Sequence, residues 1–126
     1  MLEVKPIQSK EDQKALCELC GATYDADLLA YSLFEGERIL GVCQFKMTPD
    51  GGSIRSLDLI EDTFDFIYML CAGTLNFIEL CGALYAYLDF EISPTRAKLL
   101  GFEPDENGRY RIDLKKFFSS PCKCHK

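Results

Sequence analysis

The sequence predicts a single α/β (α+β) domain with a mixed, mostly antiparallel sheet and a central βαβ unit. Two observations lead to this prediction. Three strand candidates follow one another with short, glycine-containing segments between them, a pattern that favours antiparallel hairpins. A long apolar helix then separates the third strand from a fourth, and strand–helix–strand units join parallel strands through a right-handed crossover. With 126 residues, 48% of them hydrophobic, the chain can bury a core of its own.

The first half of the chain is predicted to contain four strands and one helix. Residues 2–7 alternate apolar and polar side chains, as a half-buried strand does. Ser9 can cap a helix that ends at Gly21, because apolar residues recur between them at spacings of three and four. The antiparallel meander follows, with strands at residues 28–34, 38–47 and 53–60.

The second half is predicted to supply two helices and two strands. Residues 63–80 form a helix with hardly any polar face, so we expect neighbours to cover most of it. Residues 83–90 have the length and aromatic content of a strand, and Ser93-Pro94 opens a short helix at 95–100. Residues 109–114 alternate as a final strand. We therefore expect one domain over residues 1–118, followed by a Cys/His tail at 119–126.

The charge of the chain argues against two classes of partner. The formal net charge is −6 and no basic patch offsets it, so we expect neither nucleic acid nor an anionic membrane to bind. No apolar stretch reaches the roughly 20 residues that a membrane span requires. The first residues lack the pattern of an export signal, so we expect a cytoplasmic protein whose cysteines are reduced.

The seven cysteines allow two interpretations. Cys43, Cys71 and Cys81 lie in apolar stretches, where cysteine acts as a small core residue. A zinc site that joins the first helix to the tail would draw on thiols and one imidazole. Its candidate ligands are Cys17, Cys20, Cys122, Cys124 and His125. The alternative is a tail without metal beside two core thiols, which the one-residue gap between the tail cysteines favours.

The short helix at 95–100 ends in the tripeptide Leu100-Gly101-Phe102. A helix with this ending, followed by a last strand and preceded by the order of elements above, resembles the Gcn5-related N-acetyltransferase (GNAT) family. The resemblance covers residues 1–118 and implies a three-layer sandwich. It also implies an enzyme that transfers an acetyl group from acetyl-CoA to an amine on a small molecule or a peptide. Edge strands of this fold often pair between subunits, which makes residues 109–114 a candidate homodimer contact.

The resemblance also implies where acetyl-CoA binds. In the family, the strand that corresponds to residues 53–60 holds the pantetheine arm through its backbone and diverges from the next strand. The pyrophosphate lies at the start of the following helix. By family position, the cofactor-binding residues here are Leu57, Leu59, Thr63, Phe64, Asp65 and Phe66.

One segment departs from the family pattern. The family binds pyrophosphate with Arg/Gln-x-x-Gly-x-Gly/Ala, whose glycines let the backbone approach the phosphates. This chain has Glu61-Asp62-Thr63-Phe64-Asp65-Phe66 at that place, with three carboxylates and no glycine. The carboxylates would repel phosphates, and together with Thr63 they serve equally well to cap the helix. A second hypothesis follows, in which a non-catalytic binding or regulatory domain keeps the GNAT fold, with or without a metal-binding tail.

The candidate catalytic residues are Glu61, Asp58 and Tyr85. Many family members have a tyrosine, four residues before the glycine of Leu-Gly-Phe, that protonates the departing thiolate, and Ala97 occupies that position here. Tyr85, or Tyr87 beside it, is the candidate replacement. Asp58 or Glu61 would accept the proton of the amine, directly or through a water.

Overall fold

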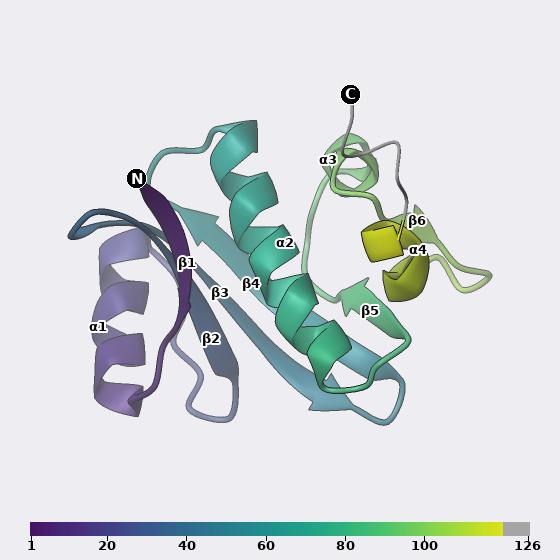
Figure 1. The fold of residues 1–126 in the computed structure, drawn as a ribbon, viewed down its shortest axis with the longest axis horizontal. Coiled ribbons are helices and arrows are strands. Elements are labelled where there is room, and N and C mark those ends of the chain that lie inside the picture. The colour runs from purple at the N-terminus through teal and green to yellow at the C-terminus, as the bar shows by residue number, and fades with distance from the viewer. Residues whose placement is uncertain (120–126) are drawn as a thin grey trace.

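The computed structural model describes residues 1–119 and places them in one seven-stranded sheet with helices on both faces (Figure 1). The strands are β1 (Leu2–Pro6), β2 (Leu29–Glu35), β3 (Arg38–Thr48), β4 (Gly51–Leu59), β5 (Tyr85–Leu88), β6 (Glu103–Pro104) and β7 (Tyr110–Asp113). The helices are α1 (Lys10–Cys20), α2 (Phe64–Leu80), α3 (Pro94–Leu99) and α4 (Leu114–Ser119). The strand order is β1-β2-β3-β4-β5-β7-β6, and within this sheet β4 and β5 form the parallel pair. The predicted fold class and its central β4–α2–β5 unit are confirmed.

The sheet is the middle one of three layers, because α1 and α2 cover opposite faces of it. On one face, Leu70 and Ile78 of α2 belong to a large core that includes Phe45 of β3. On the other face, Cys17 of α1 packs with Val42 of β3 in a smaller core. α3 and α4 lie on the same side as α2 and add to its core (Figure 1). The α1 side of β4, β5 and β7 is therefore left without a covering helix in residues 1–119.

The close approach of α2 to β4 explains where β4 begins. The sequence pattern predicts a turn at residues 49–52, but β4 already starts at Gly51. A Cβ atom at Gly52 would lie 2.5 Å from Cγ2 of Ile78, so a larger residue would push the helix away from the strand. Glycine is a packing requirement here, and a sequence pattern does not distinguish that requirement from a turn.

The C-terminal elements differ most from the prediction. The last residue of the predicted strand at 109–114 instead begins α4, a helix that the sequence pattern did not predict. Oδ1 of Asp113 accepts a hydrogen bond from the Lys116 amide (3.1 Å) and stabilises the first turn of that helix. The predicted strand at residues 109–114 is not the edge of the sheet over its whole length, because β7 pairs with β5 on one side and with β6 at Tyr110 and Arg111 on the other.

The cysteines of the described residues follow the core interpretation with one exception. Cys43 and Cys71 are buried in the large core, as predicted, and Cys17 and Cys20 are buried under α1. Cys81 is exposed, contrary to the prediction. It is the C-cap residue of α2, where the chain leaves the core face of the helix.

Candidate functional site

The two parallel strands of the sheet diverge at one end. β4 and β5 pair from Gly52 and Ala86 to Ile54 and Leu88, and the Asp89 amide then donates a last hydrogen bond to the Ile54 carbonyl (2.8 Å). Beyond this bond the two segments separate, at a point that we call the fork (Figure 1).

A β-bulge on the other side of β4 accounts for the fork. The register between β3 and β4 shifts between Gln44 and Phe45, which pair with Ser56 and Ile54 respectively, and this leaves Arg55 without a partner in the ladder. A bulge bends its strand and increases the local twist. β4 keeps its pairing with β3 after the bulge, so it turns away from β5.

The fork leaves part of the β4 backbone open. The Ile60 amide donates to the Leu40 carbonyl (2.8 Å), and antiparallel ladders alternate between hydrogen-bonded and non-hydrogen-bonded pairs. The pairs Leu59–Gly41 and Leu57–Cys43 are therefore non-hydrogen-bonded pairs of this ladder. The backbone amides and carbonyls of Leu57 and Leu59 thus point away from β3, toward the fork.

A cavity of about 390 Å³ occupies the fork on the α2 side of the sheet. We call it the fork cavity. It extends from β4 across the first turns of α2 to the start of α3, and its lining includes Leu57, Ile67, Phe90, Ile92, Ser93 and Arg96.

A second, larger cavity of about 650 Å³ lies on the α1 side of the same strand. We call it the acidic cavity. The segment between α1 and β2 forms one wall and β4 forms the floor, and the charged lining residues are Asp25, Arg55, Asp58 and Asp89. The two cavities lie on opposite faces of β4, because Leu57 lines the fork cavity while its neighbours Ser56 and Asp58 line the acidic cavity.

Asp58 has the electrostatic properties of a proton acceptor. Partial burial raises the pKa of its carboxyl above the ordinary value, and a hydrogen bond from Ser56 opposes that effect in part. A carboxylate with a raised pKa is a stronger base than an ordinary carboxylate. Asp58 lines the acidic cavity and lies on β4 between Leu57 and Leu59, whose backbone groups are open.

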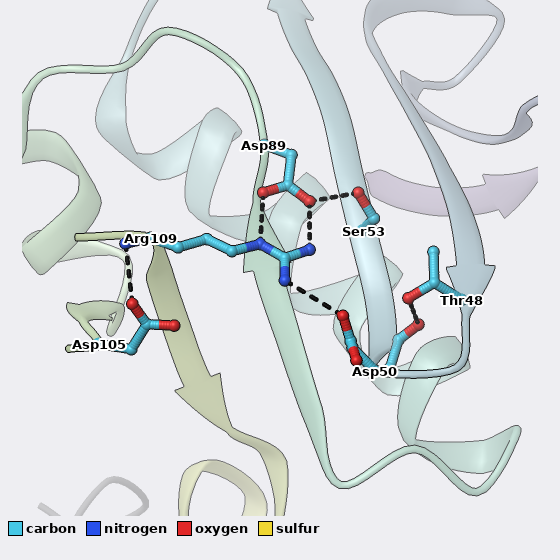
Figure 2. Close-up of polar contacts among 7 residues, drawn as sticks. Thr48, Asp50, Ser53, Asp89, Asp105 and Arg109 are labelled. Atoms are coloured by element: carbon cyan, nitrogen blue, oxygen red, sulfur yellow. Dashed lines mark hydrogen bonds and ion pairs between the residues drawn. The ribbon is translucent and has the colours of Figure 1, made fainter. Parts of the chain in front are cut away.

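An ion pair fixes the closed end of the fork (Figure 2). Nε and Nη2 of Arg109 donate to the two carboxylate oxygens of Asp89 at 2.8 Å each, and the Ser53 hydroxyl donates to Oδ2 of the same carboxylate. The guanidinium also lies 3.7 Å from the centre of the Tyr87 ring. The hydrogen bonds from Arg109 lower the pKa of Asp89. β4, β5 and the start of β7 are thereby tied together where the divergence begins.

The start of α2 is already satisfied by protein groups. Thr63 is the N-cap, and its hydroxyl accepts a hydrogen bond from the Phe66 amide (3.4 Å). Asp62 receives two hydrogen bonds from Arg96 (2.9 and 3.2 Å), and Glu61 lies 3.7 Å from Arg38. The predicted capping by Thr63 is confirmed, whereas Asp65 is not at the third helical position and does not complete a capping box.

The structure brings some of the predicted site residues together and separates others. Leu57, Leu59 and Asp58 lie side by side along the fork, while Thr63 to Phe66 form the start of α2 beside it. Glu61 is exposed and lines neither cavity.

Tyr85 lies elsewhere. It begins β5, at the end away from the fork, and lines a separate cavity of about 740 Å³ toward α4, with its ring 4.5 Å from the Arg111 guanidinium. Ala97, at the family's tyrosine position, is fully buried in the core.

Sequence reasoning missed four polar residues of this region: Gln13, Gln44, Asp89 and Arg109. One signal was present in the sequence, since Gln44 interrupts an otherwise apolar stretch of a predicted central strand. A buried amide at such a place has to be hydrogen-bonded and therefore marks a polar network. Nothing in the sequence pattern pairs Asp89 with Arg109, twenty residues later.

The structure gives the zinc expectation no support. Within residues 1–119, no group of three or more His, Cys, Asp or Glu side chains could hold a metal ion. Cys122, Cys124 and His125 lie outside the described residues. No helix in the described part of the chain is long and apolar enough to cross a membrane.

Solved structures with the same arrangement are acetyltransferases. The ribosomal-protein-S18-alanine N-acetyltransferase of Escherichia coli has a TM-score of 0.69 at 12% identity, with 90% of this chain and 94% of that chain covered. A candidate GNAT-family acetyltransferase of Desulfovibrio desulfuricans has a TM-score of 0.68 at 14% identity, covering 90% and 99%. The PaiA N-acetyltransferase of Thermoplasma acidophilum, solved in complex with coenzyme A, has a TM-score of 0.65 at 12% identity, covering 90% and 99%.

No protein-family model matches the sequence, and no curated protein matches it. The mixed sheet with its fork and with helices on both faces defines the class of fold, that of the N-acetyltransferases. Within this class, the chain has the GNAT fold in a divergent form, as the sequence predicts.

Proposed function

We propose that the protein is a GNAT-type acyltransferase that moves an acyl group from acyl-CoA to an amine. The observation that carries the proposal is the fork itself. The backbone groups of Leu57 and Leu59 face away from β3 at the place where β4 and β5 diverge, and a cavity adjoins them. Coenzyme A is present in solved neighbours of this fold, including the Thermoplasma protein.

The proposed reaction needs one proton acceptor. The amine enters from the acidic cavity and attacks the thioester carbonyl at the fork. Asp58 accepts the amine proton, directly or through a water, while the new C–N bond forms. The C–S bond then breaks and the CoA thiolate leaves. We assign no side chain to protonate it, because Tyr85 lies at the far end of β5 and position 97 is alanine.

The proposed mode of CoA binding depends mainly on the acyl-pantetheine arm. Open backbone groups on a strand can hydrogen-bond the amides of that arm as a further strand would. The start of α2 offers its dipole to a pyrophosphate, but Asp62 already binds Arg96, and Asp65 adds a negative charge in the first turn. We therefore infer a weak hold on the pyrophosphate.

The proposed acceptor is a cationic amine on a small molecule or a peptide. Asp25 and Asp58 line the acidic cavity with Arg55, whereas the charge of Asp89 is matched by Arg109. The remaining charges sum to one negative, which attracts an ammonium group. The ammonium loses its first proton to solvent, and the free amine that results is the group that attacks at the fork.

Thermal unfolding with two ligands tests the proposal. Acetyl-CoA and S-acetyl-pantetheine at concentrations far above a micromolar Kd should both raise Tm, because ligands of the native state stabilise it. The protein should also transfer the acetyl group from acetyl-CoA to a polyamine or a lysine peptide. If neither ligand moves Tm and no acyl product forms, the transferase proposal is wrong.

One observation favours a second candidate, a binding domain without catalysis. The start of α2 is satisfied by Thr63 and the Asp62–Arg96 pair, so the structure needs no phosphate there. This candidate predicts that neither acyl ligand binds. The same thermal experiment therefore separates the two.

A further inference from the structure

We propose that Gln44 is a positioning residue of the acidic cavity, which holds the wall between α1 and β2 and orients the Ser56 hydroxyl toward Asp58. The inference rests on the proposed function for the role of Asp58 as the base. Its geometry rests on the hydrogen bonds of Gln44, one of which reaches Ser56, and on Ser56 and Asp58 lying two residues apart in the lining of the same cavity.

Gln44 connects three parts of the cavity. Its Oε1 accepts hydrogen bonds from the Asp25 amide (3.2 Å) and from Nε2 of Gln13 (2.9 Å), and its Nε2 donates to the Thr23 carbonyl (2.8 Å) and to Oγ of Ser56 (3.2 Å). The wall residues and the β4 floor are therefore fixed relative to one another by a single side chain.

Every donor and acceptor position of the Gln44 side-chain amide has a hydrogen-bond partner. Gln13 and Gln44 are each 1% exposed, and a primary amide can donate two hydrogen bonds and accept two. In residues 1–119 every buried side-chain nitrogen or oxygen has a partner. Burying two amides stabilises a core no better than an aliphatic pair would, so what the pair adds is a defined geometry.

The hydrogen bond from Gln44 to Ser56 determines which role the Ser56 hydroxyl has left, that of a donor. A hydroxyl has one proton, and Oγ of Ser56 accepts from Gln44, so its own proton remains available for Asp58. The hydrogen bond from Ser56 opposes the effect of burial on Asp58 and lowers the pKa of that carboxyl. Gln44 thus acts on the proposed base through Ser56.

Other titratable groups face Asp58 from the surrounding elements. The Asp58 carboxylate adds to the rise in the pKa of the Cys17, Cys20 and Cys43 thiols, but burial is the larger cause, and the raised pKa keeps each thiol neutral. The charged groups that line the same cavity are Asp25, Arg55 and Asp89, and Arg109 neutralises the last. Because the variants below leave all of these in place, a changed titration reports on the Gln44–Ser56 connection.

The test is the titration of Asp58, followed by carbon-13 NMR of the side-chain carboxyl in the full chain. Ser56→Ala and Gln44→Met should raise its pKa by roughly 0.5 to 1 unit, because the first removes the donor and the second no longer orients it. Ser56→Thr should restore the wild-type value. Ser32→Ala, a buried serine on β2 that bonds Lys5, is the matched control and should leave Asp58 unchanged.

A kinetic measurement separates positioning from a general loss of structure. With an accepted amine, Gln44→Met should raise KM for the amine by about ten-fold while KM for acetyl-CoA stays within a factor of about two. The acid limb of the pH–rate profile should shift with the Asp58 titration. If Asp58 titrates identically in Ser56→Ala, Gln44→Met and the wild type, the inference is refuted. If the titration shifts but no variant transfers an acyl group, the positioning stands and the proposed function fails.

Discussion

Arg109 donates two parallel hydrogen bonds of 2.8 Å to the carboxylate of Asp89 at the residue where β4 and β5 part (Figure 2). The bulge at Arg55 makes the strands diverge, and this ion pair sets where the divergence starts. The candidate site therefore depends on two distant features, one in the β3–β4 ladder and one between β5 and β7.

Removal of this ion pair should destabilise the fold. Arg109→Leu leaves the partly buried Asp89 carboxylate without its main partner, and we expect a loss of about 1.5 to 3 kcal/mol in the free energy of unfolding. Arg38→Leu is the matched control, since its contact with Glu35 is exposed and should be worth less than about 1 kcal/mol. Urea unfolding of both variants gives the comparison. Equal losses would show that the Arg109 pair is no stronger than a surface contact.

The same pair should make stability depend on pH. Arg109 lowers the pKa of Asp89 in the folded state, so the stabilisation is fully present above the unfolded value of about 3.9 and is lost as pH falls through the folded value. Asp89→Asn should thus be less stable than the wild type at pH 6 and approach it at low pH. Thermal unfolding between pH 6 and pH 2 measures the difference. Parallel curves would contradict the prediction.

Gly51 should tolerate no side chain. Its φ is +141°, and a Cβ atom there would clash with the backbone carbonyl of Tyr85. Gly82 also has a positive φ, +95°, but open space around it. Gly82→Ala should cost about 1 kcal/mol from backbone strain alone, and Gly51→Ala clearly more, because β5 would have to move. Chemical denaturation of the two variants tests this, and similar losses would show that β5 yields easily.

The carboxylate at the start of α2 should weaken binding of acetyl-CoA. Asp65 has no ion pair within the described residues, and a like charge at close range costs up to about 1 kcal/mol in water. Asp65→Asn should therefore lower Kd for acetyl-CoA by roughly 2- to 5-fold and leave S-acetyl-pantetheine unaffected. Glu79→Gln, near the other end of α2, is the control.

Salt provides an independent check on this repulsion. At about 1 M ionic strength the screening length falls to about 3 Å, so acetyl-CoA should bind the wild type more tightly than at low salt. Isothermal titration at both salt concentrations measures this. Acetyl-CoA binding that weakens with salt would mean that positively charged side chains outweigh the carboxylates around the bound phosphates.

The proposed base can be tested against the competing candidate. Asp58→Asn removes the proton acceptor and should lower kcat/KM by roughly 10²- to 10⁴-fold, the usual contribution of such a group. Tyr85→Phe should leave the rate within about two-fold, because Tyr85 lies away from the fork. Steady-state kinetics with one amine decides between the two residues. A large effect of Tyr85→Phe would show that Tyr85 takes part in the reaction after all.

Local patterns were sufficient for most elements of the fold. Short glycine turns predicted the antiparallel strands, and the apolar run from Phe64 to Leu80 predicted the buried crossover helix. These signals are read within a few residues, so tertiary packing seldom overrides them. The prediction failed where packing decided the outcome: Gly51 and Gly52 lie in β4 under α2, and Leu114 starts a helix.

The candidate site was predictable only in part. The lack of glycine from Ser53 through Ala72 and the acids at Glu61, Asp62 and Asp65 could be read directly from the sequence. Their partners could not, because Arg38 and Arg96 come from remote segments. The sequence by itself determined the order of the elements and the unusual chemistry at the start of α2. Only the tertiary structure decided that Asp58, Ser56 and Gln44 share one cavity at a fork held by Asp89 and Arg109, since such contacts form when distant strands pair.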